Sequence, residues 1–178
     1  MTQPEPNNIV LVDSQDQMIG TTTKTHAHQA GLIHRAFSVF LLDAQQNVLL
    51  QQRHPDKYHC GGLWTNTCCS HPRPDETPCQ AGERRLQEEL GFSTTLQPVG
   101  EFCYRAPFSN GLIEHEYDHV LLGHYHNEPL DQFNPTEIAA LRWLSIPALE
   151  NALEHDADSY TPWLKPALEK VARYINHR

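Results

Sequence analysis

The sequence lacks a long apolar run and an excess of basic charge, and each absence excludes a class of protein. No stretch approaches the roughly 18 consecutive apolar residues of a membrane span, and the polar start MTQPEPNN is unlike the basic and then apolar start of a secretory signal. The formal net charge of -9 argues against general nucleic-acid binding, which usually requires a basic face. We therefore expect a cytoplasmic protein that binds neither membranes nor nucleic acids.

Cysteine is present, but without the spacing that builds disulfide frameworks or zinc knuckles. The five cysteines are an odd number and form no paired C-x-x-C motifs, so we expect reduced thiols. Cys68 and Cys69 are poorly placed to bridge each other. Adjacent Cα atoms lie about 3.8 Å apart, whereas a disulfide requires roughly 4.4–6.8 Å.

The sequence does contain enough apolar residues for one globular core. Its 178 residues, 39% of them hydrophobic, predict a single domain over residues 1–178, with residues 1–8 as a flexible tail. Apolar patterns predict strands over residues 9–13, 35–42, 48–53, 96–106, 114–126 and 137–145. Helices are expected over residues 78–90, 147–155 and 162–177. Because strands and helices are mixed along the chain, we expect an α/β layered fold.

The clearest of these helices spans residues 78–90. Thr77 can act as its N-cap, Pro78 suits the first helical position, and Gln80 completes a capping box. Gly91 provides the C-terminal stop. Residues four apart give a face for the core: Gly82, Leu86 and Leu90. Three charged residues are expected on a different, polar face: Arg85, Glu88 and Glu89.

The segment TNTCCSHP, residues 65–72, places two thiols next to a histidine. In an extended chain the side chains alternate, so Cys69 and His71 point to one side and Cys68 to the other. One thiol is therefore expected to face the core and the other to face His71. Cysteine is also common as a small buried hydrophobe, and that interpretation stays open for both thiols.

The segment EHEYD, residues 114–118, places Glu114 and Glu116 on one face of a strand. Two carboxylates on one face repel unless a cation or a shared proton holds them, although a solvated edge face would also satisfy them. His28 and His34 flank the turn-like QAGLI and could join His71 and the glutamates around a divalent ion such as zinc, manganese or iron(II). Scattered histidines are usually surface residues, so spacing alone leaves this hypothesis open.

Residues 70–92 connect these segments. Glu76, followed after seven residues by RRLQEELGF, is similar to the Nudix box, in which carboxylates hold magnesium against a diphosphate and activate water. Two positions depart from that box. Ser70 stands in place of its glycine, and Arg85 stands in place of its first metal-binding glutamate. The arginine disables the hydrolytic carboxylate cluster and adds a cation.

With these departures, the motifs TNTCCSHP, YRA at 104–106, EHE and TPWL at 161–164 resemble the type I isopentenyl diphosphate isomerases, a Nudix-fold family. The resemblance extends from about Lys24 to Trp163. It implies a Nudix-like α/β/α sandwich around a mixed β-sheet, with an N-terminal strand and a C-terminal helix added. It also implies an isomerase of isoprenoid precursor biosynthesis. This enzyme interconverts isopentenyl and dimethylallyl diphosphate by protonating the alkene and deprotonating the tertiary cation.

The resemblance further implies the roles of individual residues. Cys69 is the catalytic thiol and Glu116 its partner across the substrate, with Tyr104 near Glu116. A second divalent ion, Mn²⁺ or Zn²⁺, is implied at His28, His34, His71, Glu114 and Glu116. Magnesium on the substrate diphosphate is associated with Glu89. Substrate binding is assigned to Lys24, Arg53, Lys57, Arg85 and Trp163. The interval from His28 to His34 is one residue shorter than in the family, which leaves His26 as a rival to His28.

Several alternatives remain open at this level. In the isopentenyl direction we expect Glu116 as the acid and Cys69 as the base, with the roles exchanged in reverse. A Nudix hydrolase is the alternative enzyme, favoured by Glu76, Glu88 and Glu89. A non-catalytic metal-binding module using the thiols and His71 is the third hypothesis. The protein is expected to be a monomer or a weak homodimer whose partner is a small-molecule diphosphate.

Overall fold

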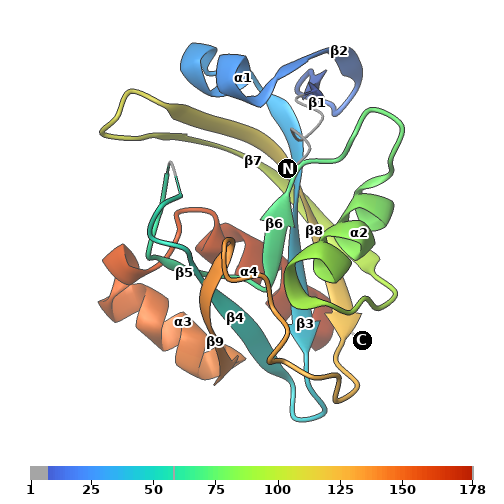
Figure 1. The fold of residues 1–178 in the computed structure, drawn as a ribbon, viewed down its shortest axis with the longest axis vertical. Helices are drawn as coiled ribbons and strands as arrows, with labels where there is room; N and C mark the ends of the chain where they lie inside the picture. The colour runs from blue at the N-terminus through green and yellow to red at the C-terminus, as the bar shows by residue number, and fades with distance from the viewer. Residues whose placement is uncertain (1–7, 58, 178) are drawn as a thin grey trace.

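The computed structural model describes residues 8–57 and 59–177, which form one mixed sheet with helices on both faces (Figure 1). The strands are β1 (Asn8–Val12), β2 (Met18–Thr23), β3 (His34–Leu42), β4 (Asn47–Arg53), β5 (Trp64–Thr65), β6 (Cys68–Ser70), β7 (Gln97–Pro107), β8 (Ile113–His124) and β9 (Ile138–Ser145). The helices are α1 (Lys24–Ala30), α2 (Pro78–Leu90), α3 (Ile146–His155), α4 (Leu164–Asn176) and the short 3-10 helix η1 (Ala157–Ser159).

Strand β3 is the centre of the sheet. It pairs antiparallel with β1, β4 and β6 and parallel with β8, which makes the sheet mixed. Its apolar side chains alternate between two cores, as the pleat requires. Phe37 and Val39 pack on the face covered by α2, whereas Phe40 and Leu42 pack on the face covered by α3 and α4. The predicted α/β/α sandwich is therefore confirmed, with the C-terminal helix α4 covering one face (Figure 1).

Helix α2 begins and ends where the sequence predicts. The Thr77 side chain accepts from the Gln80 amide, Gln80 reaches back to complete the capping box, and Gly91 ends the helix with a φ of 83°. Gly82 is required for close packing, because a Cβ there would lie 2.7 Å from Leu96 Cδ1. Glu89 lies beside Arg85 on the predicted polar face, but it is only 3% exposed. Its buried carboxylate accepts hydrogen bonds from inside the protein, as described below.

The N-terminal region contains two elements that the apolar pattern did not predict, β2 and α1. Thr23 caps α1 by accepting from the His26 amide, and Gly31 ends it with a φ of 68°. The turn-like interpretation of residues 29–33 is therefore wrong for its first two residues, which belong to the helix. Asn8 already pairs with Thr23, so it is part of the sheet, and the rest of the predicted tail lies outside the described residues.

The C-terminal elements agree with the prediction to within two residues. Strand β9 pairs antiparallel with β4 and leads directly into α3, which Ser145 caps by accepting from the Ala148 amide. Helix α4 begins at Leu164 rather than Pro162, with Trp163 at its N-cap position. None of the helices in the described part of the chain combines the length and the apolar character of a transmembrane span.

Candidate active site

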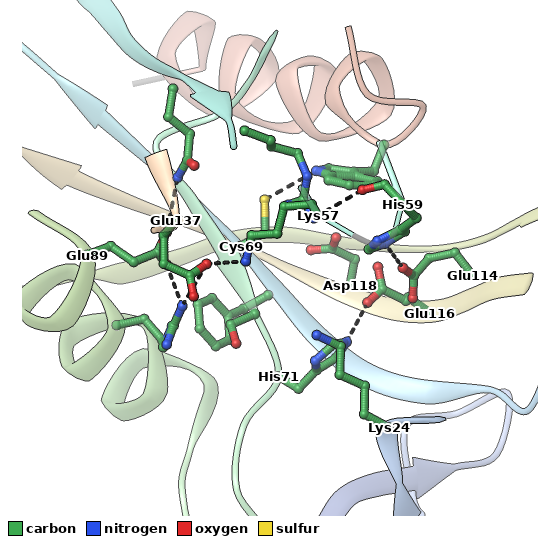
Figure 2. Close-up of a pocket in the computed structure, with 16 residues that line it drawn as sticks. Lys24, Lys57, His59, Cys69, His71, Glu89, Glu114, Glu116, Asp118 and Glu137 are labelled. Atoms are coloured by element: carbon green, nitrogen blue, oxygen red, sulfur yellow. Dashed lines mark hydrogen bonds and ion pairs between the residues drawn. The ribbon is translucent and has the colours of Figure 1, made fainter. Parts of the chain in front are cut away.

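A single pocket brings together most of the residues that the sequence singles out (Figure 2). Ten of the predicted site residues line it: Lys24, Arg53, Lys57, Cys69, His71, Arg85, Glu89, Glu114, Glu116 and Trp163. The other three contact its lining from behind: His28, His34 and Tyr104. In Figure 2, Cys69 lies between Glu89 on one side of the pocket and the Glu114, Glu116 and His71 side chains on the other.

Cys69 reaches the pocket from β6, where it pairs with Ser38 of β3. Its sulfur donates to Asn66 Oδ1 at 3.2 Å and accepts from the Trp163 indole N–H at 3.2 Å. Burial raises the pKa of the Cys69 thiol to about 12, and the nearby Arg53 offsets only part of that increase. At neutral pH the sulfur therefore carries its proton.

Cys68 points to the opposite side of β6, as side-chain alternation predicts. It is fully buried and packs in the core beneath α2. Its sulfur also donates to Glu89 Oε2 at 2.9 Å, a contact that the sequence did not predict. Burial and the Glu89 carboxylate raise the pKa of this thiol well above its ordinary value, so Cys68 remains a hydrogen-bond donor.

Glu114 and Glu116 share one face of β8, and that face is buried. They are 2% and 7% exposed, because β8 lies between β3 and β7 rather than at a solvated edge. Ligand atoms of Glu114 and three histidines, from α1, β3 and the end of β6, all lie within 4.8 Å of one another: His28, His34 and His71. His26, the rival position, is exposed on α1.

Each carboxylate contacts one histidine of its own, and both contact His34. Glu114 Oε1 lies 2.7 Å from His28 Nε2 and 3.2 Å from His34 Nε2. Glu116 Oε2 lies 3.0 Å from His71 Nε2 and 3.5 Å from His34 Nε2. We refer to these five residues as the histidine–glutamate group. Imidazole nitrogens and carboxylate oxygens in such a cluster suit zinc, manganese or iron(II).

His34 provides the test of whether a divalent ion fits this group. Its Nδ1 lies 2.9 Å from the Leu32 carbonyl and donates to it, which directs Nε2 toward the carboxylates. Nε2 is buried and makes no well-directed hydrogen bond to the described residues. Burial lowers the pKa of His34, but Glu114 and Glu116 outweigh it and raise the value to about 10. The two carboxylates thus favour a positive charge near His34 Nε2. A divalent ion would supply that charge.

Tyr104 lies directly across from Glu116 in the β7–β8 ladder. Its hydroxyl donates to Glu116 Oε1, whereas Oε2 faces the histidines. Burial and the Glu116 charge raise the pKa of the Tyr104 hydroxyl well above its ordinary value. Burial and Glu114 raise the pKa of the Glu116 carboxyl, but contacts with His34 and His71 outweigh them and lower it. Glu116 is therefore an ionised carboxylate with a fixed orientation.

The opposite side of the pocket is built around Glu89. Arg85 Nη2 lies 3.2 Å from Glu89 Oε2, as expected for residues four apart on a helix, and Gln51 donates to Oε1 at 3.3 Å. Lys57 pairs with Glu137, whose carboxylate also lies 3.8 Å from Arg85. We refer to these five residues as the Glu89 group. The Arg53 guanidinium lies nearby, 5.6 Å from the centre of the Trp163 ring.

Sequence reasoning missed several residues that line the pocket. Asp118 continues the alternation of Glu114 and Glu116, a signal that was present in the sequence. It accepts from Ser38 at 2.8 Å, and burial with the neighbouring Glu116 raises its pKa well above the ordinary value. His59 lies in the loop after β4, where no periodic pattern marks it, and its Nε2 is 2.6 Å from Glu114 Oε2.

Comparison with known proteins places this architecture in a family. The NUDIX domain model matches residues 32–164. The isopentenyl-diphosphate Delta-isomerase of Burkholderia multivorans is 44% identical over 170 residues, which cover 96% of this chain and 96% of that protein. The enzyme of the same name from Serratia proteamaculans is 46% identical over 155 residues, covering 87% and 86% of the two chains.

Solved structures agree on the fold. The crystal structure of DR0079 from Deinococcus radiodurans has a TM-score of 0.72 at 19% identity and covers 90% of this chain and 96% of that one. A MutT NUDIX hydrolase from Burkholderia pseudomallei has a TM-score of 0.62 at 21% identity, covering 78% and 98%. At these identities the likeness concerns the fold alone. The sequence matches show that the chain is a NUDIX-domain protein and belongs to the isopentenyl-diphosphate Delta-isomerase family.

Proposed function

We propose that the protein interconverts isopentenyl diphosphate and dimethylallyl diphosphate, a reaction consistent with the name of its family. The observation that carries the proposal is the placement of a protonated thiol, Cys69, and an ionised carboxylate, Glu116, around one pocket that also gathers basic side chains. Moving a double bond requires one proton to be donated and another to be accepted. The two side chains supply one group for each step.

The charge states favour the opposite acid–base assignment to the one expected from sequence. Before the reaction, one of Cys69 and Glu116 must hold a proton as the acid and the other must lack one as the base. Burial raises the pKa of the thiol, and the histidines lower the pKa of the carboxyl, so the proton lies on sulfur. In the isopentenyl direction Cys69 donates this proton to the terminal methylene carbon, and Glu116 accepts one from the carbon next to the cation. The reverse direction exchanges the roles.

The positive charge between the two proton transfers requires stabilisation in a water-poor site. Trp163 is 3% exposed and lines the pocket, and its N–H contacts the Cys69 sulfur. A cation near an indole face gains roughly 0.5–2 kcal/mol. We therefore assign Trp163 two tasks, orienting the thiol and facing the carbocation.

The histidine–glutamate group is the proposed site of a divalent ion, Mn²⁺ or Zn²⁺, which when bound would withdraw electron density from the carboxylates and fix their orientation. Tyr104 holds Glu116 from the other side through its hydroxyl. The chain therefore restrains both oxygens of Glu116, one by the histidines and one by a phenol.

The Glu89 group is the proposed site of the substrate diphosphate and its magnesium. The protein carries a formal net charge of -9, so an anionic substrate requires a local cationic cluster. Lys24, Arg53, Lys57 and Arg85 all line the pocket. Arg85 contacts Glu89 directly, and we assign Glu89 to the magnesium that accompanies the diphosphate.

The proposal is tested by incubating the protein with isopentenyl diphosphate, Mg²⁺ and Mn²⁺, and measuring acid-labile product and released phosphate separately. We expect acid-labile dimethylallyl diphosphate without phosphate release. Phosphate release without migration of the double bond would instead identify a hydrolase and overturn the proposal. Cys69→Ala serves as the matched inactive control.

A further inference from the structure

His59 has a position that the roles assigned above do not explain. It lies in the loop between β4 and β5, yet its side chain is only 6% exposed, and it lines the pocket beside Glu114 and Trp163. Figure 2 shows its ring directed at Glu114. Burying a polar loop side chain such as His59 is costly unless it makes a hydrogen bond, so its contact with Glu114 is the feature to explain.

The contact with Glu114 has a defined direction. His59 Nε2 lies 2.6 Å from Glu114 Oε2, and the other carboxylate oxygen, Oε1, faces His28 and His34. An ionised carboxylate only accepts hydrogen bonds, so the hydrogen lies on His59 Nε2 and His59 is the donor. Each oxygen of Glu114 therefore has its own partner: His59 on one side and the inner histidines on the other.

Aromatic neighbours fix the plane of the His59 ring. The Phe108 ring meets it edge to face with centroids 5.2 Å apart, and the Trp163 ring lies 6.1 Å away at 38°. These contacts come from the β7–β8 turn and from the start of α4. With its ring held from two sides, His59 can hold a carboxylate in a single orientation.

We propose that His59 is a positioning residue that holds Glu114 Oε2 so that Oε1 stays directed at His28 and His34, thereby strengthening divalent-ion binding by the histidine–glutamate group. The inference rests on the proposed metal site. His59 is not one of the proposed metal ligands. Its proposed role is to restrain the ligand Glu114 rather than to coordinate the ion. Hydrogen bonds to metal-binding carboxylates and imidazoles typically change metal affinity by about 10- to 100-fold.

The test uses three substitutions at one position. His59→Leu removes the donor, His59→Gln retains an N–H at nearly the reach of Nε2, and His59→Asn retains an amide that is too short. The dissociation constant of Mn²⁺ is measured by chelator competition on the full chain without substrate, and spin-echo spectroscopy of bound Mn²⁺ counts its imidazole ligands. His155→Leu removes an exposed histidine of α3, outside the pocket lining, as the matched control.

We expect His59→Leu and His59→Asn to weaken Mn²⁺ binding about 10- to 100-fold, His59→Gln to restore most of it, and the imidazole count to stay unchanged throughout. If His59→Leu does not fold, the difference between Gln and Asn tests the same claim. Wild-type affinity in the Leu and Asn variants would overturn the inference, and so would a lower imidazole count, which would make His59 a ligand. Wild-type protein that binds no Mn²⁺ would overturn it too, whereas Mn²⁺ binding without isomerisation would count against the proposed function alone.

Discussion

The two sides of the pocket neutralise their carboxylates in different ways. In the histidine–glutamate group, Glu114 and Glu116 are surrounded by imidazoles, which can lose a proton. In the Glu89 group, Glu89 and Glu137 are paired with Arg85 and Lys57, cations that keep their charge at neutral pH. The first group can therefore exchange a proton for a metal ion. The second keeps fixed cations, which suit an anionic ligand that brings its own magnesium.

The largest expected effect lies between the two sides, at Cys69. Cys69→Ala removes the proposed acid, so turnover should fall by at least about 100-fold, while Mn²⁺ content stays at the wild-type level because the sulfur is not a ligand. Product formation and metal analysis on the same preparation check both points. Cys103→Ala, at an exposed thiol, is the matched control. Metal content that falls together with activity would make Cys69 a ligand and contradict its proposed role.

The second prediction separates the two carboxylate groups. Glu116→Gln should lower turnover and also weaken Mn²⁺ binding by at least about 10-fold, because Glu116 is assigned to both the reaction and the ion. Glu89→Gln should raise the KM for the diphosphate and leave Mn²⁺ binding unchanged. Steady-state kinetics and Mn²⁺ titration of both variants test the difference. Equal loss of Mn²⁺ affinity in the two variants would mean that the pocket holds one merged metal site.

The third prediction concerns the proton on His34. Its pKa is raised to about 10, so the metal-free group holds a proton at pH 7, and an incoming divalent ion must displace it. Mn²⁺ binding at pH 7 should release about one proton, and affinity should rise with pH until the pH approaches 10. Titration calorimetry in buffers of different ionisation enthalpy measures the release. Binding without proton release would show that the histidines are already neutral.

The smallest expected effect lies behind Glu89. Cys68→Val keeps an apolar, slightly larger side chain but removes the donor to Glu89 Oε2, which keeps its contact with Arg85. We expect the free energy of unfolding to fall by about 1–2 kcal/mol, with a modest rise in the KM for the diphosphate. Urea denaturation and kinetics check the two values. A variant as stable as the wild type would show that the Cys68–Glu89 contact contributes nothing to the fold.

Much of the fold could be predicted from local sequence signals, namely helix caps and apolar runs. The cap residues Thr77 and Gly91 fixed α2, and apolar runs located β3 and β4. Strand β2 and helix α1 were missed because their side chains are largely polar and exposed, with burial patterns that carry little periodic signal. The missed helix matters for the site, because α1 places His28 in the histidine–glutamate group.

The site also has features that local sequence patterns predict and features that depend on distant segments. Alternation within TNTCCSHP and EHEYD indicated which side chains share a face, and the structure places Cys68 and Cys69 on opposite sides as expected. Sequence could not indicate the protonation of Cys69, because its pKa depends on burial created by distant segments. It also could not indicate His59, since a loop residue has no periodicity and its contact with Glu114 joins residues 55 positions apart.

The most direct test of the account is a crystal structure of the Mn²⁺-loaded protein with a bound five-carbon diphosphate. We expect the diphosphate in the Glu89 group and the ion in the histidine–glutamate group. We also expect the Cys69 sulfur and a Glu116 oxygen on opposite faces of the carbon chain, each about 3–3.5 Å from a reacting carbon. A carbon chain that contacts only one of these two side chains would contradict it.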